Sequence, residues 1–259
     1  MITRRHFLHL LLGAGVGGAA LEAWTHDTPF PRACRVHAAT IPAPAGWAGK
    51  KALFITDVHY GNLFGPAEAA ALTAMVRREA PDLVLMGGDL AHTPRMDLTG
   101  FFAAWAPGCP TFFSPGNHDL NRRASGTILA QARAGGIEVL NNTNLPWNGV
   151  TLTGLPSALR EEQRLNLLKA PGFKIVLGHE PDEWDRYRQP DLLHLAGHTH
   201  GGQIRLLGRP VRLPPLGRKY PLGEYTRPGS TLIVSAGIGY AEAPIRINCP
   251  PQIIRLVFV

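Results

Sequence analysis

Short runs of apolar residues recur along the chain from residue 51 onward and alternate with helical patterns. Runs of strand length occupy residues 52–56, 83–88, 111–116, 174–178 and 192–197. Helical patterns occupy residues 65–79, 97–105 and 125–134. This alternation predicts an α/β layered domain. Later apolar runs at 150–155, 231–236 and 253–259 predict further strands, partly antiparallel, so we expect the sheets to be mixed.

The first residues have the pattern of an export signal rather than of a folded element. Arg4 and Arg5 precede a stretch from Phe7 to Leu21 that carries no charged residue and is short for a membrane span. The hexapeptide from Thr3 to Leu8 resembles the twin-arginine signal of bacteria. We expect residues 1–23 to be a twin-arginine export signal, or an anchor if it stays uncut, with the twin-arginine translocase as partner during export. An amphipathic or disordered leader is the alternative.

Residues 24–48 differ in composition from the rest of the chain. They contain four prolines and no long hydrophobic period, which predicts a linker with an edge strand. The folded domain is then expected to occupy residues 49–259. Three cysteines exclude a disulfide-dense small fold, and none lies in a C-x-x-C pair that would predict a thiolate zinc site. A bond between Cys109 and Cys249 after export stays an open alternative.

Length and charge exclude few classes of protein or partner. The chain has 259 residues, 45% of them hydrophobic, which is enough for a sizeable core. Its 26 basic and 19 acidic residues give a net charge of +7. A basic chain favours anionic partners such as nucleic acid, phosphorylated metabolites or an acidic membrane surface, and charge alone does not choose among them.

Polar side chains follow the predicted strands at the point where each strand ends. These candidate site residues are Asp57, His59, Asp89, Asn117, His118, His179, His198 and His200. Ligands of open α/β sheets bind at the carboxyl ends of the strands, so we expect these side chains to converge on one rim. Glycines precede four of the motifs, at Gly88, Gly116, Gly178 and Gly197, and are expected to let the backbone turn sharply.

Seven of these residues are candidate metal ligands, since the eighth, His118, is set aside. Asp89 is expected to be shared by two ions. One site would add Asp57, His59 and His200, and the other would add Asn117, His179 and His198. The mixture of oxygen and imidazole donors suits two divalent ions of Mn, Fe, Zn or Ni better than Ca or Mg. Two ions about 3.5–4 Å apart hold both oxygens of an in-line phosphoryl displacement, and a water bridging them would become a hydroxide nucleophile.

His118 is the candidate catalytic residue. Next to Asn117, it is placed to protonate the leaving oxygen or to stabilise the transition state. Asp119 is expected to orient it. His92 and His194 are predicted to be structural.

Each motif taken alone has an ordinary explanation. Gly-Gly-Asp is usually a turn, Asn-His-Asp often caps a helix, and a lone histidine such as His179 is usually structural. The paired histidines at 198 and 200, in a glycine frame, have little structural purpose. All five motifs in this order, each behind an apolar strand, indicate a functional site.

The same motifs carry a family resemblance. The blocks at 57–59, 88–89, 116–119, 178–179 and 197–200 resemble the signature of the calcineurin-like metallophosphoesterases. The resemblance covers about residues 50–259. It implies a four-layer αββα sandwich with two mixed β-sheets, the seven residues above as metal ligands, and His118 as the catalytic residue.

The tail resembles one branch of that family. Residues 201–205, 220–225 and 237–246 are similar to bacterial exported phosphodiesterases, a branch that also includes a UDP-2,3-diacylglucosamine hydrolase of lipid A synthesis. The resemblance implies a dinuclear-metal phosphodiesterase at the cell envelope, in the periplasm or on the outer face of the cytoplasmic membrane. The lipid A role is the alternative, and the leader suits it less well because that substrate is made on the cytoplasmic side.

Residues 203–228 combine basic and apolar side chains. Six arginines and lysines stand against one glutamate, with leucines between them. Such a segment suits an anionic lipid headgroup or sugar nucleotide at a membrane surface, and an ordinary solvated hairpin is the alternative. Too few aromatics lie there to stack bases, so nucleic acid is the less favoured partner. We therefore expect a phosphorylated small-molecule or lipid-linked substrate. A non-catalytic, metal-braced envelope-binding module and a di-iron redox protein are the competing classes.

Overall fold

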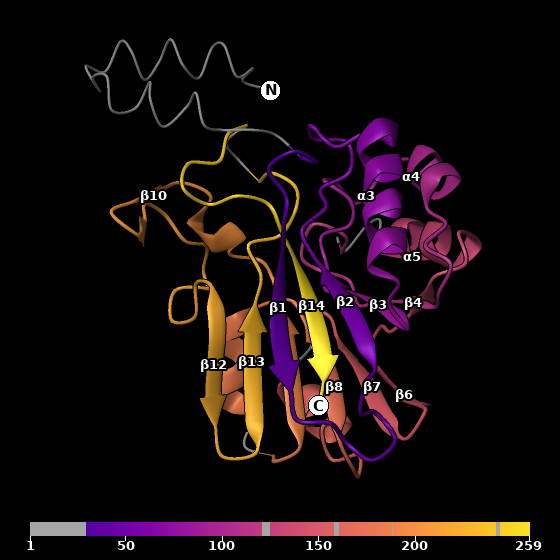
Figure 1. Cartoon of the computed structure of the whole chain (residues 1–259), viewed down its shortest axis with the longest axis vertical. Helices are drawn as coiled ribbons and strands as arrows, with labels where there is room; N and C mark the ends of the chain where they lie inside the picture. Colours follow the sequence, from indigo (N-terminus) through magenta and orange to yellow (C-terminus); the bar gives the residue numbers. More distant parts are fainter. Residues whose placement is uncertain (1–29, 121–124, 158–160, 188, 242–243) are drawn as a thin grey trace.

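The computed structural model describes residues 30–120, 125–157, 161–187, 189–241 and 244–259. The predicted export signal at 1–23 lies outside the described residues. Two six-stranded mixed sheets form the centre of the molecule, and helices lie on their outer faces (Figure 1). No helix within the described ranges is long and apolar enough to span a bilayer.

The first sheet combines parallel and antiparallel pairs. Its strands in spatial order are β1 (Arg35–Ile41), β14 (Gln252–Phe258), β2 (Lys51–Ile55), β3 (Leu83–Met86), β4 (Thr111–Phe113) and β5 (Glu138–Val139). The strands from β2 to β5 are parallel, and β14 runs antiparallel to β2 and parallel to β1. β1 lies within segment 24–48 and forms an edge of this sheet. Trp47, from the same segment, packs between the two sheets against Phe258.

The second sheet has a parallel centre and antiparallel edges. Its strands in spatial order are β12 (Gly223–Arg227), β13 (Ser230–Val234), β9 (Leu192–Ala196), β8 (Lys174–Gly178), β7 (Val150–Leu155) and β6 (Thr143–Trp147). The four central strands are parallel, and only the two edge strands pair antiparallel. A separate two-stranded hairpin joins β10 (Arg205–Leu206) to β11 (Arg209–Pro210).

Alternate residues of the central strands enter different hydrophobic clusters. In β3, Leu83 and Leu85 face the second sheet, whereas Val84 and Met86 face the helices on the other side. In β8, Ile175 likewise packs between the sheets. Because side chains alternate across a strand, a strand covered on both faces must be apolar throughout. This is why the central strands are continuous apolar runs in the sequence.

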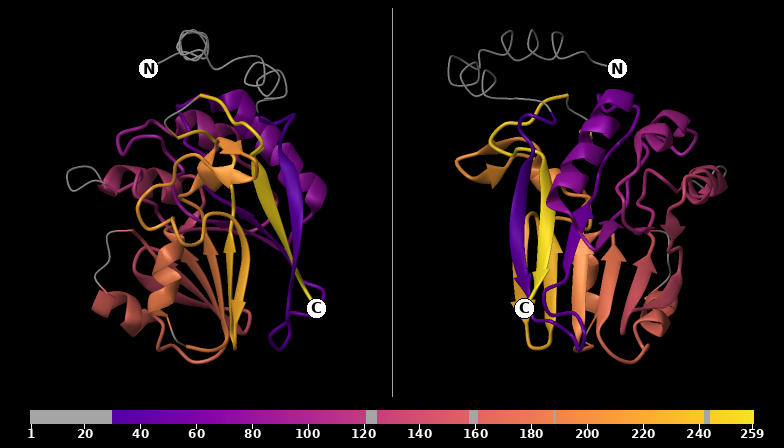
Figure 2. Two further views of the ribbon diagram at one scale, coloured as in Figure 1. Left: turned by 90° about the vertical axis from the view of Figure 1, so that its left-hand side faces the viewer. Right: turned by 45° about the vertical axis from the view of Figure 1, so that its right-hand side comes forward.

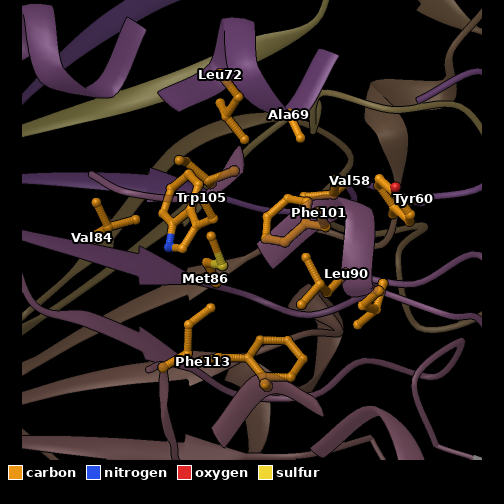
Figure 3. Close-up of a cluster of buried hydrophobic side chains, with 14 of the residues drawn as sticks. Val58, Tyr60, Ala69, Leu72, Val84, Met86, Leu90, Phe101, Trp105 and Phe113 are labelled. Atoms are coloured by element: carbon orange, nitrogen blue, oxygen red, sulfur yellow. The ribbon is translucent and has the colours of Figure 1, made fainter. Parts of the chain in front are cut away.

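Helices cover the outer face of each sheet (Figure 2). On the first sheet lie α3 (Pro66–Glu79), α4 (Thr99–Ala104) and α5 (Ser125–Ala134). Figure 3 shows Leu72, Phe101 and Trp105 packed with Val84 and Met86. On the second sheet lie α6 (Glu161–Leu167) and the short 3-10 helix η1 (Pro181–Arg186). The four-layer sandwich is confirmed, as is the α/β class.

Helix α3 shows why its segment is helical. Pro66 occupies its first turn, and Glu68 Oε2 accepts a hydrogen bond from the Gly65 amide at 2.9 Å. The buried positions are 69, 72, 73 and 76, a spacing that places them on one face. The helix ends where Ala80 adopts a left-handed conformation with φ of 45°. The helix predicted at 97–105 is shorter than expected, since it begins at Thr99.

Candidate metal centre

The candidate site residues come from both sheets. Asp57 and Asp89 follow β2 and β3 of the first sheet, whereas His179 follows β8 and His198 follows β9 of the second. The sheets meet directly here, because the His198 amide donates to both carboxylate oxygens of Asp57 at 3.1 Å. His200 begins the short helix η2 (His200–Gly202). The predicted convergence of these strand ends is therefore observed.

The backbone is strained at the site residues themselves. Positive φ values occur at Asp57 (54°), His59 (49°), Asp89 (53°), His198 (69°) and His200 (50°). A left-handed conformation is unfavourable for a residue with a Cβ and persists only where the surroundings impose it. Such strain concentrates at functional sites, and five of the 14 non-glycine residues with positive φ in the described part of the chain are candidate site residues.

The glycines at the strand ends serve the site differently from what the sequence suggested. Of the four that precede site residues, only Gly88 has a positive φ, at 98°. At Gly116 an added Cβ would overlap Asp89 Oδ1, and at Gly197 it would overlap Asp57 Oδ2. The requirement at these two positions is close approach to a carboxylate, not a sharp turn.

One cluster joins Asp57, His59 and His200, all of them buried. His59 Nε2 lies 3.1 Å from His200 Nε2, and His200 Nε2 lies 3.4 Å from Asp57 Oδ1. Asp89 Oδ2 is 3.6 Å from His59 Nε2. The structure thus brings together the four residues predicted for the first ion.

A second cluster joins Asp57, Asp89 and His179. Asp89 Oδ2 lies 3.1 Å from His179 Nε2, so this carboxylate is within reach of both clusters. The His198 ring lies beside the His179 ring, with centroids 5.0 Å apart. Asn117 is exposed and adjoins His118 in the chain, and its role as a ligand stays a prediction.

Backbone carbonyls determine which ring nitrogen donates in two of these histidines. His179 Nδ1 lies 2.8 Å from the Gly87 carbonyl, and His198 Nε2 lies 2.8 Å from the Pro215 carbonyl. A carbonyl oxygen only accepts, so each of these nitrogens donates, and when the ring is neutral the lone pair is on the other nitrogen. At His179 this second nitrogen, Nε2, lies 3.1 Å from Asp89 Oδ2. Once Nε2 has lost its proton, its lone pair and the facing carboxylate oxygen fit a cation held between them.

Burial shapes the titration of the cluster. It lowers the pKa of His59 to about 3 and the pKa of His200 well below its usual value, so both rings are neutral, as metal ligands must be. Burial, with the nearby Asp89 charge, raises the pKa of Asp57 to about 6. Burial opposes protonation of His179 too, but the facing Asp89 carboxylate raises its pKa well above the usual value. The donor set and its charges fit two divalent ions.

His118 is fixed at the edge of these clusters. Its backbone amide donates to Asp89 Oδ1 at 2.8 Å, and its Nδ1 lies 2.9 Å from the carbonyl oxygen of His92, to which it donates. The predicted role of Asp119 in orienting His118 is wrong. The Asp119 carboxylate instead accepts hydrogen bonds from three backbone amides, those of Leu90, Ala91 and Gly116. Asp119 therefore fixes the loops that carry the site.

Sequence reasoning missed two neighbours of the site. His92, predicted to be structural, has its Nδ1 3.4 Å from His59 Nδ1 and its ring stacked on His118. Its place three residues after Asp89, in the same loop, was the available signal. Arg246 is buried beside His200 and donates to the carbonyls of several neighbouring residues. The only sequence signal for it was its place at the end of the block 237–246, which indicated no contact with the site. His194 is structural as predicted, buried with its Nε2 donating to the Gly178 carbonyl.

Comparisons with known proteins identify similar sequences and structures. The model of the calcineurin-like phosphoesterase family matches residues 50–202. YkuE of Bacillus subtilis, an uncharacterized metallophosphoesterase, is 27% identical over 97% of this chain and 96% of its own length. The phosphodiesterase YaeI of Escherichia coli is 29% identical over 81% of this chain and 82% of its own length. A solved dimetal phosphatase from Danio rerio aligns over 74% of this chain and 88% of its own, with 12% identity and a TM-score of 0.38.

The family match covers more than half of the chain, so the protein belongs to the calcineurin-like phosphoesterase family. It is a metal-dependent phosphoester hydrolase, and its buried His/Asp clusters are consistent with the dimetal site typical of the family.

Proposed function

We propose that this protein is an exported phosphodiesterase that acts with two divalent metal ions at the cell envelope. The observation that carries the activity is the position of Asp89, which is within reach of both buried clusters and also holds the His118 amide. Its relative YaeI is named a phosphodiesterase, which supports the choice of diester over monoester.

The residues of this chain would hold the ions as follows. His59 and His200 face one position, His179 and His198 face the other, and both Asp57 and Asp89 are within reach of the two. When bound, the two ions supply Lewis acidity to the phosphoryl group and acidify water. The protein contributes preorganisation, because carbonyl partners already hold the rings of His179 and His198 in the ligating tautomer.

His118 would supply the proton for the leaving oxygen. Its Nδ1–H is held by the His92 carbonyl, so proton exchange with substrate falls to Nε2. The same carbonyl stabilises the ring when both nitrogens are protonated, because it accepts from the more acidic N–H of the imidazolium. After transfer the ring returns to the tautomer that the carbonyl selects.

Purified protein loaded with Mn²⁺ is expected to hydrolyse bis(4-nitrophenyl) phosphate. Asp89→Asn removes charge from both clusters and His200→Ala removes a donor from one, so each should abolish turnover. His37→Ala is the matched control, since His37 is exposed on β1. Full activity in either site variant would reject the site, and inert metal-loaded protein on a broad phosphoester panel would favour a non-catalytic binding module.

The envelope location rests on residues 1–23. A twin-arginine signal carries proteins that are already folded, which suits an enzyme that loads its metal before export. Replacing Arg4 and Arg5 by lysine should retain the protein inside the cell, as measured by cell fractionation. Unchanged export of that variant would remove the twin-arginine route from the proposal.

A second candidate is the UDP-2,3-diacylglucosamine pyrophosphate hydrolase of lipid A synthesis. The exposed leucines among arginines in residues 205–212 favour it, because that substrate is both anionic and lipidic. Comparing UDP-2,3-diacylglucosamine with simple phosphodiesters at equal metal loading decides between the two. Preference for the sugar nucleotide would replace the envelope phosphodiesterase by this second candidate.

A further inference from the structure

The β10–β11 hairpin stands apart from both large sheets (Figure 1). Its strands pair Arg205 with Pro210 and Leu206 with Arg209. The two residues between them, Leu207 and Gly208, have φ values of 49° and 77°. Positive φ at both central residues of a two-residue hairpin loop is the signature of a type I′ turn.

The residue at the tip of this hairpin does not suit its turn. Type I′ turns favour Asn, Asp or Gly at the first central position, and a leucine there adopts an unfavourable backbone conformation. Leu207 is also fully exposed, at 101%. Its neighbours Leu206 and Val211 are 58% and 61% exposed. Together, Leu206, Leu207 and Val211 form an exposed apolar tip that is open to contact with a surface outside the molecule.

Basic side chains surround these apolar ones. Residues 203–222 contain no aspartate or glutamate. Arg209 and Arg212 lie in and just after β11 and are exposed. An apolar tip flanked by arginines matches the interface of an anionic bilayer, where acyl chains accept leucines and headgroup phosphates accept arginines. Residues 205–212 carry no aromatic side chain on which a nucleic acid base would stack.

Hydrogen bonds and close packing hold the hairpin against the end of the molecule that carries the candidate metal centre. Arg205 donates from Nη1 to the Gly201 carbonyl at 2.9 Å, and its amide donates to the Ile247 carbonyl at 2.9 Å. Gly202 packs so closely on Pro210 that a Cβ there would overlap it. Gly201 and Gly202 belong to η2, which begins with His200. Strands β8, β9 and β13 point toward this same end (Figure 2).

We propose that the β10–β11 hairpin docks the protein on an anionic phospholipid surface. Leu206, Leu207 and Val211 enter the interface between headgroups and acyl chains, and Arg209 and Arg212 bind headgroup phosphates. Because η2 ties the hairpin to His200, docking holds the candidate metal centre in a fixed orientation near the bilayer surface.

Vesicle sedimentation of the full-length protein tests this directly. Vesicles of equal parts phosphatidylglycerol and phosphatidylcholine are compared with vesicles of phosphatidylcholine alone. The substitution Leu207→Asn places a favoured residue in the type I′ turn, so it should leave thermal unfolding unharmed while weakening binding about tenfold. Arg209→Gln should weaken binding to the anionic vesicles about fivefold.

Val259→Asn is the matched control, because Val259 is also exposed, at 67%, and lies at the opposite end of the molecule from the hairpin (Figure 1). It should bind like the unaltered protein, and all variants carry the same leader, so differences between them report the hairpin. Turnover of bis(4-nitrophenyl) phosphate in solution should be unchanged by Leu207→Asn.

Three results would overturn the proposal. The first is the absence of any preference for anionic vesicles in the unaltered protein. The second is equal binding by the unaltered protein and Leu207→Asn. The third is unchanged vesicle binding together with loss of self-association in Leu207→Asn, which would assign the hairpin to an interface between copies of this chain.

Discussion

The Nδ1 atoms of His59 and His92 lie 3.4 Å apart, and the opposite nitrogen of His59 faces Asp89 and His200. For His59 Nε2 to bind an ion, its Nδ1 must carry the proton and donate it to His92. His92 would therefore orient His59, a candidate metal ligand, without belonging to the seven predicted ligands. Partners of this kind fix the tautomer and raise the basicity of the ligand.

His92→Ala should weaken metal binding by about 10- to 100-fold, because His59 loses the acceptor that holds its ligating tautomer. Titration of metal-stripped protein with Mn²⁺ measures the change. His37→Ala, on the exposed face of β1, should have no effect. Equal affinities for His92→Ala and the unaltered protein would show that His59 is oriented without His92.

Metal affinity should rise with pH. The pKa of His179 is raised well above its usual value by the facing Asp89 carboxylate, against the effect of burial, and the pKa of Asp57 is raised to about 6. Both groups must lose their protons to bind an ion, so protons compete below these pKa values. Binding at about pH 6 should be weaker than at about pH 8 and should release protons.

Isothermal titration in two buffers of different ionisation enthalpy counts those protons. His194 should contribute no proton to this count, since burial lowers its pKa to about 3 and the ring stays neutral at both pH values. Equal affinity at both pH values, with no proton release, would contradict the assignment of His179 and Asp57 as ligands.

His118→Ala should retain the metals and lose about 10²- to 10⁴-fold in kcat. Metal binding survives because the backbone amide of residue 118, not its side chain, donates to Asp89. The loss should be greater for an alkyl diester than for bis(4-nitrophenyl) phosphate, whose leaving group needs little protonation. A loss of metal, measured by elemental analysis, would instead place His118 among the ligands.

Asp119→Ala should destabilise the protein by about 3 kcal/mol, because it leaves three backbone amides without their acceptor. Thermal unfolding of metal-free protein is expected to show a Tm lower by about 10 °C. Asp119→Asn keeps one acceptor oxygen, so its Tm should lie between those of Asp119→Ala and the unaltered protein. Glu138→Ala, at an exposed position of β5, is the control, and an equal Tm for Asp119→Ala and this control would deny Asp119 its structural role.

The central strands were predictable because both of their faces are buried. β3 is apolar throughout, and β2 and β8 are apolar after their first residue, a lysine in each, so their continuous runs stand out in the sequence. The edge strand β1 mixes exposed and buried positions, and β12 has only exposed and half-buried ones, so neither leaves such a run. Their positions in the sheets depend on the strands with which they pair, and local sequence does not indicate that pairing.

The candidate ligands were predictable because each directly follows a central strand. Their convergence follows from the topology, since both sheets present the carboxyl ends of parallel strands at one end of the molecule. The contacts of His92, Asp119 and Arg246 were not predictable. They depend on loop backbone atoms, namely the carbonyls and amides that these side chains reach, and these leave no hydrophobic pattern.

The candidate ligands that follow β2 and β3 belong to one half of the sandwich, and those that follow β8 and β9 belong to the other. A bound pair of cations would therefore link the two sheets at one end of the hydrophobic core that lies between them. Any small slip of one half over the other would pull His179 away from Asp89. Replacing a side chain in that core, such as Leu85 or Ile175, by a larger or smaller one should thus change the affinity for the cations without touching a ligand.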